Sequence, residues 1–312
     1  MAGRTLQHRL TSGRYTLPVA LLVAVACRLA VQPGTEDVLR LWAGLPVHVL
    51  TAWVLIVLNN AYGLVRQRAS LQSAVYLLLV SLGPDLYGLQ AGHVVGLAVA
   101  GSLFFLFRAY RSLSAPAALF LSMACLGIGC FVVPRLVFFM PVYWIGAYSL
   151  QAFSARSFFG SLLGWMFPFW FLLGHAWFYG EMELFTTPFL GMVRFDPFFQ
   201  GLGVGQWVTL GYLAALLLVS GGYMLGYGRD EKIRTRCCLR FMMGAGACFL
   251  VAMVLQPSLY VSLMPALAVC VSVPACRLFV LTRSRAANVV FHVFLWTGLL
   301  VFLGNLYLHY RS

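Results

Sequence analysis

Charged side chains are scarce in this chain of 312 residues, and acidic side chains are the scarcest. Only 9% of the residues are Asp, Glu, Lys or Arg, and 8 are Asp or Glu. Soluble domains carry about 25% charged residues, so the chain lacks the polar groups that would cover a folded surface in water. Disordered chains and nucleic-acid modules need a polar composition as well. The sequence therefore excludes all three classes and predicts a membrane protein.

Cysteine and histidine patterns of known metal sites are missing as well. The eight cysteines show no C-x-x-C spacing of a metal or redox site. Those inside apolar runs are expected to act as small hydrophobic residues. His93 and His175 have no second histidine at a metal-binding spacing. We therefore expect no histidine metal site and interpret both histidines as packing residues.

Long apolar runs are abundant, because 62% of the residues are hydrophobic. A helix needs about 20 apolar residues to cross the hydrocarbon core of a bilayer. Eleven runs approach this length, and they predict an all-α transmembrane bundle that forms one domain over residues 1–312. The third and fifth runs are short for a full span. The runs are residues 15–31, 45–64, 71–86, 92–107, 115–131, 136–152, 158–178, 205–226, 239–255, 258–279 and 289–308.

The placement of basic residues predicts the orientation of these runs. Cytoplasmic loops carry the excess of Lys and Arg. With the basic segment 1–14 inside, eleven spans place 16 of the 21 basic residues on the inner side, four of them in the loop 227–238, and the C-terminus outside. The net charge of +13 is then an insertion signal for a bacterial inner membrane. The five exceptions are Arg28, Arg40, Arg135, Arg194 and Arg311.

Six of the eight acidic residues fall on the predicted outer side. In one interpretation they only cap helices and avoid the inner face. In the other, carboxylates at the lipid–water boundary act as a general base or hold a divalent cation. Both interpretations stay open. The six residues are Glu36, Asp37, Asp85, Glu181, Glu183 and Asp196.

Three arginines on the outer side are candidate ligands of a lipid phosphate. Arg28 lies near the outer end of the first run, Arg135 follows a proline at an outer turn, and Arg194 lies in the loop 179–204. A guanidinium group can hold a phosphate with two hydrogen bonds, although it can also simply extend to the water boundary. The loop itself is rich in aromatic residues, so it is either a lid over a substrate or an interfacial anchor.

Several short segments resemble a multi-pass inner-membrane family of the Bacteroidetes. The resemblance implies a polytopic inner-membrane protein, but that family has no established activity. The segments are LNNAY at 58–62, YLLL at 76–79, SLGPD at 81–85, YSLQAF at 148–153, RSFFGSLLGW at 156–165 and PFW at 168–170.

A more distant resemblance is to glycosyltransferases of the GT-C type. Their shared module has an acidic pair in the first outer loop, a further acid between the third and fourth helices, and a long loop after the seventh. Glu36 with Asp37, Asp85 and the loop 179–204 occupy these places. The resemblance implies a polyprenyl-phosphate sugar as the substrate, with Asp37 as base or cation ligand, supported by Glu36 and Asp85. The first outer loop is shorter than in that class, and no large outer domain is present.

Three functions therefore remain open. The first is an envelope enzyme that acts on lipid-linked sugars at the outer face. The second is an assembly subunit that packs against a membrane-protein partner. The glycine-rich stretches at 201–205 and 221–222, with Gly244 and Gly246, would allow close helix packing inside the protein or against another chain. The third is a transporter of a lipid-like or small polar substrate, for which the spans offer few ionisable residues. Membrane lipids are expected partners of all three, and nucleic acids of none.

Overall fold

The computed structural model describes residues 16–31, 38–65, 70–112, 114–227, 232–281 and 285–311. Within these ranges the chain forms α-helices joined by short 3-10 helices, and it contains no β-strand. The all-helical class predicted from the apolar runs is confirmed. The helices are α2 (Thr16–Ala30), α3 (Val38–Tyr62), α4 (Leu71–Val80), η1 (Pro84–Leu86), α5 (Ala91–Arg108), α6 (Ala115–Val132), η2 (Pro134–Phe139), α7 (Met140–Ser149), α8 (Ala155–Tyr179), α9 (Met182–Val193), α10 (Val204–Tyr227), α11 (Ile233–Leu255), η4 (Pro257–Leu259), α12 (Tyr260–Leu281) and α13 (Arg285–Arg311).

Eight of these helices are long and apolar enough to cross a membrane. Each of them overlaps one of the predicted runs, so the chain is a multi-pass membrane protein. The eight apolar segments are Leu41–Tyr62, Ala91–Arg108, Ala115–Val132, Ala155–Tyr179, Val204–Met224, Ile233–Leu255, Pro257–Val280 and Asn288–Arg311.

The other three predicted runs form short helices. α2 has 15 residues, and α4 and α7 have 10 each. The third predicted run is short, as expected, whereas the fifth forms α6, whose 18 apolar residues are enough to cross a membrane. The sixth run is also short, because it is divided into η2 and α7. Pro134 and Pro141 start these two pieces, because proline cannot donate the backbone hydrogen bond that a continuous helix needs.

Hydrogen bonds and ring contacts bring one set of helix ends together at what we call the basic end. Arg234, in the first turn of α11, donates through Nη2 to the carbonyl oxygen of Phe107 on α5 at 3.2 Å. Its guanidinium carbon also lies 4.8 Å from the ring centroid of Tyr62, the last residue of α3. The backbone N–H of Arg111, after α5, donates to the carbonyl oxygen of Leu150, after α7.

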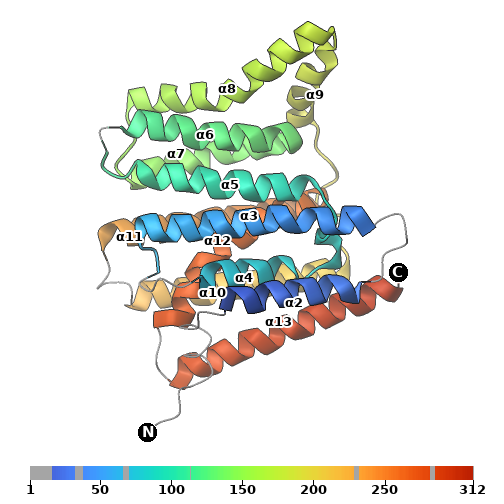
Figure 1. The fold of residues 1–312 in the computed structure, drawn as a ribbon. Helices are drawn as coiled ribbons and strands as arrows, with labels where there is room; N and C mark the ends of the chain where they lie inside the picture. Colours follow the sequence, from blue (N-terminus) through green and yellow to red (C-terminus); the bar gives the residue numbers. More distant parts are fainter. Residues whose placement is uncertain are drawn as a thin grey trace.

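The acidic end lies on the opposite side of the bundle and holds Asp85, Glu181, Glu183 and Asp196. Gln206 in the first turn of α10 donates to the Oδ2 atom of Asp85 in η1 at 3.2 Å. Near the end of α13, the hydroxyl of Tyr310 donates to the carbonyl oxygen of Ala30, which ends α2. Figure 1 shows α2 and α13 both running toward the acidic end, where α13 ends.

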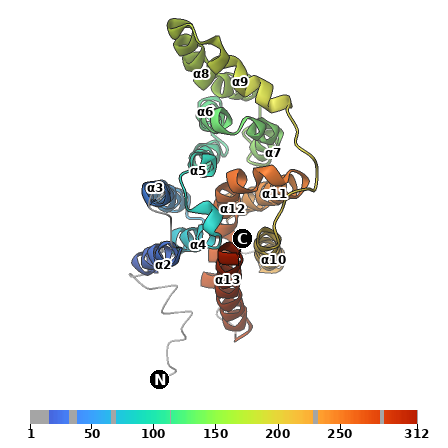
Figure 2. The same ribbon diagram turned by 90° about the vertical axis from the view of Figure 1, so that its right-hand side faces the viewer.

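Helix α12 lies in the middle of the bundle. Residues 263–280 of α12 are all buried within the protein, and α12 packs against α4, α5, α10 and α11. Gly92 and Gly96 of α5 face Pro265, and a Cβ atom at Gly96 would lie 2.8 Å from the Cβ atom of Pro265. Viewed end-on in Figure 2, α8 and α9 lie at one edge of the molecule, and α2 and α13 lie at the other.

Glycines bring α6 and α8 into backbone contact. A Cβ atom at Gly164 of α8 would overlap the carbonyl oxygen of Phe120, and one at Gly160 would lie 3.1 Å from the carbonyl oxygen of Pro116. Small residues allow this approach where lipid removes the hydrophobic drive for helix association. Among the glycines that the sequence suggests for such contacts, Gly205, Gly221 and Gly246 have close neighbours, namely Asn305, Met243 and Cys270. An added Cβ at Gly201, Gly203, Gly222 or Gly244 has no atom within 4 Å among the described residues.

Candidate functional site

The predicted carboxylates do not form a common pocket within the described residues. Glu36 and Asp37 lie outside those residues. Asp85 is exposed on η1, where its Oδ2 atom accepts a hydrogen bond from Gln206 and its carbonyl oxygen accepts one from Gln90 at 3.1 Å. Its described partners are therefore two amide side chains at the acidic end.

The predicted phosphate ligands Arg135 and Arg194 lie together on the surface of the acidic end. Nη2 of Arg135 donates to Oδ2 of Asp196 at 2.8 Å, Nη1 donates to Oγ of Ser258 at 3.1 Å, and Nε donates to the carbonyl oxygen of Arg194 at 2.9 Å. The Ser258 hydroxyl also donates to Asp196. Hydrogen bonds from Ser258 and Arg135 lower the pKa of the Asp196 carboxyl group. We call Arg135, Asp196 and Ser258 the clamp.

The predicted lid forms helix α9 and the segment that leads to α10. Glu181 and Glu183 are exposed at the start of α9. The ring of Phe189 packs on Phe169 of α8 with 5.0 Å between centroids, and Gly191 faces Pro134 of η2. α9 therefore covers the ends of α8 and η2, at the edge of the molecule farthest from α2 and α13 (Figure 2).

Arg28 belongs to a buried polar cluster near the acidic end. It lies in the last turn of α2, where a positive charge suits the helix dipole, and its side chain is only 1% exposed. The guanidinium carbon lies 4.8 Å from the ring centroid of Tyr87, the residue after η1. Nη1 has one weak contact, at 3.5 Å, with the carbonyl oxygen of Ala24.

Two histidines from other helices complete this cluster. His48 of α3 and His93 of α5 are buried, and their ring centroids are 4.3 Å apart. Nδ1 of His48 is 2.9 Å from the hydroxyl of Tyr76 on α4, and both imidazoles lie in the electrostatic field of Arg28. We call Arg28, His48, His93, Tyr76 and Tyr87 the basic cluster.

The basic cluster contains four nitrogen atoms without a hydrogen-bond partner among the described residues. They are Nε and Nη2 of Arg28 and Nε2 of each histidine. Nδ1 of His93 lies 3.3 Å from the backbone nitrogen of Gln90 and 3.2 Å from its carbonyl oxygen, so Nε2 is a donor when Nδ1 accepts and an acceptor when Nδ1 donates. Buried polar groups in proteins are almost always paired. This cluster therefore presents unused donors and a buried positive charge, which is the complement of an anion.

Backbone atoms enclose the basic cluster on two sides. A Cβ atom at Gly44 of α3 would overlap Nε2 of His93 and would lie 2.6 Å from the carbonyl oxygen of Tyr87. The hydroxyl of Tyr87 donates to the carbonyl oxygen of Ser81 at 2.8 Å, after α4. Glycine at position 44 is thus what allows the imidazole to lie against α3.

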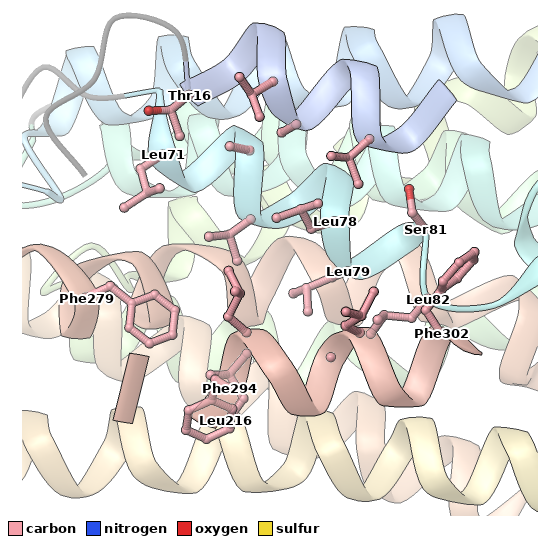
Figure 3. A pocket seen from close by; sticks show the side chains of 18 of the residues that line it. Thr16, Leu71, Leu78, Leu79, Ser81, Leu82, Leu216, Phe279, Phe294 and Phe302 are labelled. Atoms are coloured by element: carbon pink, nitrogen blue, oxygen red, sulfur yellow. The ribbon is translucent and has the colours of Figure 1, made fainter. Parts of the chain in front are cut away.

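An apolar cavity of about 340 Å³ is lined by Cys27, the residue before Arg28, although no side chain of the basic cluster lines it. Its walls come from α2, α4, α10, α12 and α13, as the side chains in Figure 3 show. Thr16, Leu71 and Phe279 lie toward one end, and Ser81, Leu82 and Phe302 lie toward the other (Figure 3). The cavity lies within the apolar, helix-crossed part of the protein.

These features define a polytopic α-helical membrane protein with a buried basic cluster next to an apolar cavity. Within the described residues no group of three His, Cys, Asp or Glu side chains could hold a metal ion. Comparison with protein-family models, with curated proteins and with solved structures gives no match. The function is therefore argued from the site alone.

Sequence reasoning identified only part of the basic cluster. The sequence predicts Arg28 as a phosphate ligand and His93 as a packing residue, and it yields no prediction for His48. The available signal was an ionisable side chain inside an apolar run, which is costly in a membrane and commonly marks a functional site. His48 carries that signal, because it lies inside α3 between Val47 and Val49.

Proposed function

We propose that the basic cluster binds the phosphate group of a membrane lipid at the outer face of a bacterial inner membrane. The observation that carries the proposal is Arg28, a buried cation with two guanidinium nitrogens unpartnered among the described residues. A phosphate would accept hydrogen bonds from Nε and Nη2 in the two-pronged manner that guanidinium favours. The Nε2 atom of each histidine would donate as well in the tautomer in which its Nδ1 atom accepts a hydrogen bond.

The neighbouring chain segments support a polyprenyl-phosphate sugar as the lipid. Glu36 and Asp37 lie in the segment between α2 and α3, the helices that carry Arg28 and His48. Asp85 is two residues before Tyr87 of the cluster. In this proposal Asp37 is the base or the ligand of a divalent cation, and Glu36 and Asp85 support it in sugar transfer during envelope biogenesis.

Eleven crossings, with the N-terminus inside and the C-terminus outside, are part of the same proposal. Helices α2, α4 and α7 would then cross or partly cross the membrane with their flanking segments. The described cations Arg108, Arg111, Arg156 and Arg234 belong to helix ends and loops at the basic end, which supports a cytoplasmic location for that end. The basic cluster would then lie toward the outer face.

A lipid-binding measurement tests the phosphate site. The purified protein in phosphatidylcholine nanodiscs would be titrated with undecaprenyl phosphate and analysed by native mass spectrometry. Losing charged hydrogen bonds commonly costs a factor of about ten or more in affinity, and we expect at least this loss for Arg28→Gln. Arg135→Gln is the matched control, because Arg135 already has protein partners at the clamp. Equal binding by wild type and Arg28→Gln would reject the site.

A transfer assay tests the enzymatic part separately. Membranes containing the protein would be supplied with a radiolabelled polyprenyl-phosphate sugar, and transfer would be compared for wild type, Asp37→Asn, Glu36→Gln and Asp85→Asn. We expect transfer to be lost in Asp37→Asn while phosphate binding persists. Sugar transfer at the wild-type rate by all three variants would show that the carboxylates have no role in the reaction. Lipid binding without transfer, in a protein that purifies with a partner, would favour the assembly-subunit function.

A further inference from the structure

The apolar cavity is an elongated slot rather than a round pocket. Along α2 its lining extends from Thr16 to Cys27. Eleven helical steps of 1.5 Å give a length of about 16 Å. The slot volume of about 340 Å³ is at the small end of the range for small-molecule sites. These dimensions suit one extended chain.

The lining of the slot matches hydrocarbon. Its walls are leucine, valine, alanine and phenylalanine side chains, with few polar atoms reaching the cavity surface. Water needs two to four polar partners to occupy a cavity, and this lining supplies few. In a membrane, the available apolar filling is a hydrocarbon chain.

The slot is accessible from the side, between α2 and α13. Val19 and Val23 of α2 line it and are 47% and 40% exposed at the protein surface. Leu295 and Leu299 of α13 also line it and are exposed to a similar degree. A chain could therefore enter from the surrounding lipid without passing through water.

One end of the slot is lined by neighbours of the basic cluster, although no side chain of the cluster itself lines the slot. Cys27 lines the slot, and the next residue is Arg28. Ser81 lines the same end, and its carbonyl oxygen accepts the hydroxyl of Tyr87, the ring beside Arg28. A chain in the slot would thus end next to the buried positive charge. The slot is complementary to the hydrocarbon chain of a lipid phosphate, and the charge of Arg28 is complementary to its phosphate group.

We infer that the slot binds the hydrocarbon chain of a single-chain lipid phosphate, with the phosphate at Arg28. This inference rests on the proposed phosphate site and names the lipid class it takes. One slot beside one buried cation accommodates one chain and one anionic group. A polyprenyl phosphate has this composition, whereas a phospholipid carries two chains. The chain binds with its far end at Leu71 and Phe279, toward the basic end.

Photo-crosslinking with a short polyprenyl phosphate tests the inference. The probe is farnesyl phosphate with a diazirine at its far end, added to the full-length protein in phosphatidylcholine nanodiscs. Labelled peptides are expected from the start of α4 and the end of α12. Val23→Trp places a large ring at the slot and should lower this labelling about tenfold, because buried chain contacts are lost. Leu22→Trp is the control, since Leu22 is 68% exposed and does not line the slot.

The outcomes separate the slot from the phosphate site. Labelling that is spread over lipid-facing helices would overturn the binding of the chain in the slot. Unchanged labelling in Val23→Trp would overturn it as well. Equal competition by phosphatidylglycerol and unlabelled farnesyl phosphate overturns the single-chain assignment. Farnesol with the same diazirine tests the phosphate: we expect weaker labelling than with farnesyl phosphate, and equal labelling of wild type and Arg28→Gln by farnesol. If farnesol labels the wild-type slot as strongly as farnesyl phosphate, the phosphate site fails although the slot stands.

Discussion

Arg135 and Asp196 lie 61 residues apart in the chain and form an ion pair with 2.8 Å between Nη2 and Oδ2. With Ser258 they connect η2, the segment after α9, and η4. Each of the three guanidinium nitrogens of Arg135, Nε, Nη1 and Nη2, donates to a protein oxygen. Among the described residues, Arg28 makes one hydrogen bond, at 3.5 Å, and lies against the ring of Tyr87. Arg28 therefore keeps guanidinium nitrogens that could bind a ligand, whereas Arg135 does not.

We predict that Asp196→Asn exposes the segment between α9 and α10 to protease. The substitution removes the charge that Arg135 pairs with, although the amide can still accept a hydrogen bond. Limited proteolysis of the protein in nanodiscs measures the effect. Asp85→Asn is the control, because the described partners of Asp85 are uncharged. Equal cleavage rates in wild type and Asp196→Asn would contradict the prediction.

The same clamp should depend on pH. Ser258 and Arg135 lower the pKa of Asp196 in the folded protein, so the carboxylate stabilises the fold at any pH above its unfolded pKa. This contribution is lost as the pH falls through the lowered pKa. Protease protection should therefore persist into mildly acidic solution and disappear in stronger acid, and Asp196→Asn should lack this acid step. An acid step of equal size in the variant would show that other groups cause it.

We predict that Arg28→Met raises thermal stability in the absence of lipid. Burying a charge without a partner is costly, and replacement of buried ionic groups by apolar side chains is often neutral or stabilising by about 1 to 4 kcal/mol. A thermal unfolding scan of lipid-depleted protein measures the change. Farnesyl phosphate should then stabilise wild type by binding the folded state and leave the variant unchanged. A variant that is less stable than wild type would indicate that Arg28 has a structural role instead.

The α6–α8 contact predicts opposite effects for two glycines on one helix. At Gly164 an added methyl group overlaps the carbonyl oxygen of Phe120, so Gly164→Ala should cost about 1 to 3 kcal/mol. Gly174 is exposed and has no atom within 4 Å of an added Cβ. Gly174→Ala should therefore be neutral or stabilise by about 0.5 to 1 kcal/mol. Denaturant or thermal unfolding of both variants measures the difference, and equal stabilities would contradict the close contact.

The fold was largely predictable because each apolar run is a local property of the sequence. All eleven runs coincide with helical segments, and Gly180, with a φ of +73°, ends α8 where the predicted span ends. Helix lengths were less predictable. Pro134 and Pro141 shorten α7, whereas α6 continues to Val132. Glycine contacts were the least predictable, since Gly164 and Gly222 have similar apolar sequence neighbours and only packing distinguishes them.

A reporter fusion distinguishes eleven crossings from eight. Eight crossings would put both termini on the same side, whereas eleven put them on opposite sides. Alkaline phosphatase is active only outside the cytoplasm, so we expect an active enzyme when it is fused after Ser312 and an inactive one when it is fused at the N-terminus. An inactive C-terminal fusion, with green fluorescent protein fluorescent at the same position, would contradict the eleven-span topology.

The basic cluster could not be assembled from the sequence. Its members come from α2, α3, α4, α5 and the turn after η1, and no spacing rule connects Arg28 with His48 or His93. Each member is a single polar residue among apolar sequence neighbours, and such a residue is usually interpreted as a packing residue. Only the three-dimensional arrangement shows that their free nitrogens lie in one group.

The burial of α12 has a consequence for how the protein is made. Residues 257–280 contact α4, α5, α10 and α11, yet the ribosome synthesises them after all of those helices. Gly92 and Gly96 of α5 thus cannot contact Pro265 until more than 160 further residues have been translated. Until then the earlier helices are held in the membrane without their common neighbour. Final assembly of the bundle is therefore a late event, and chains that end before α12 are expected substrates for membrane quality control.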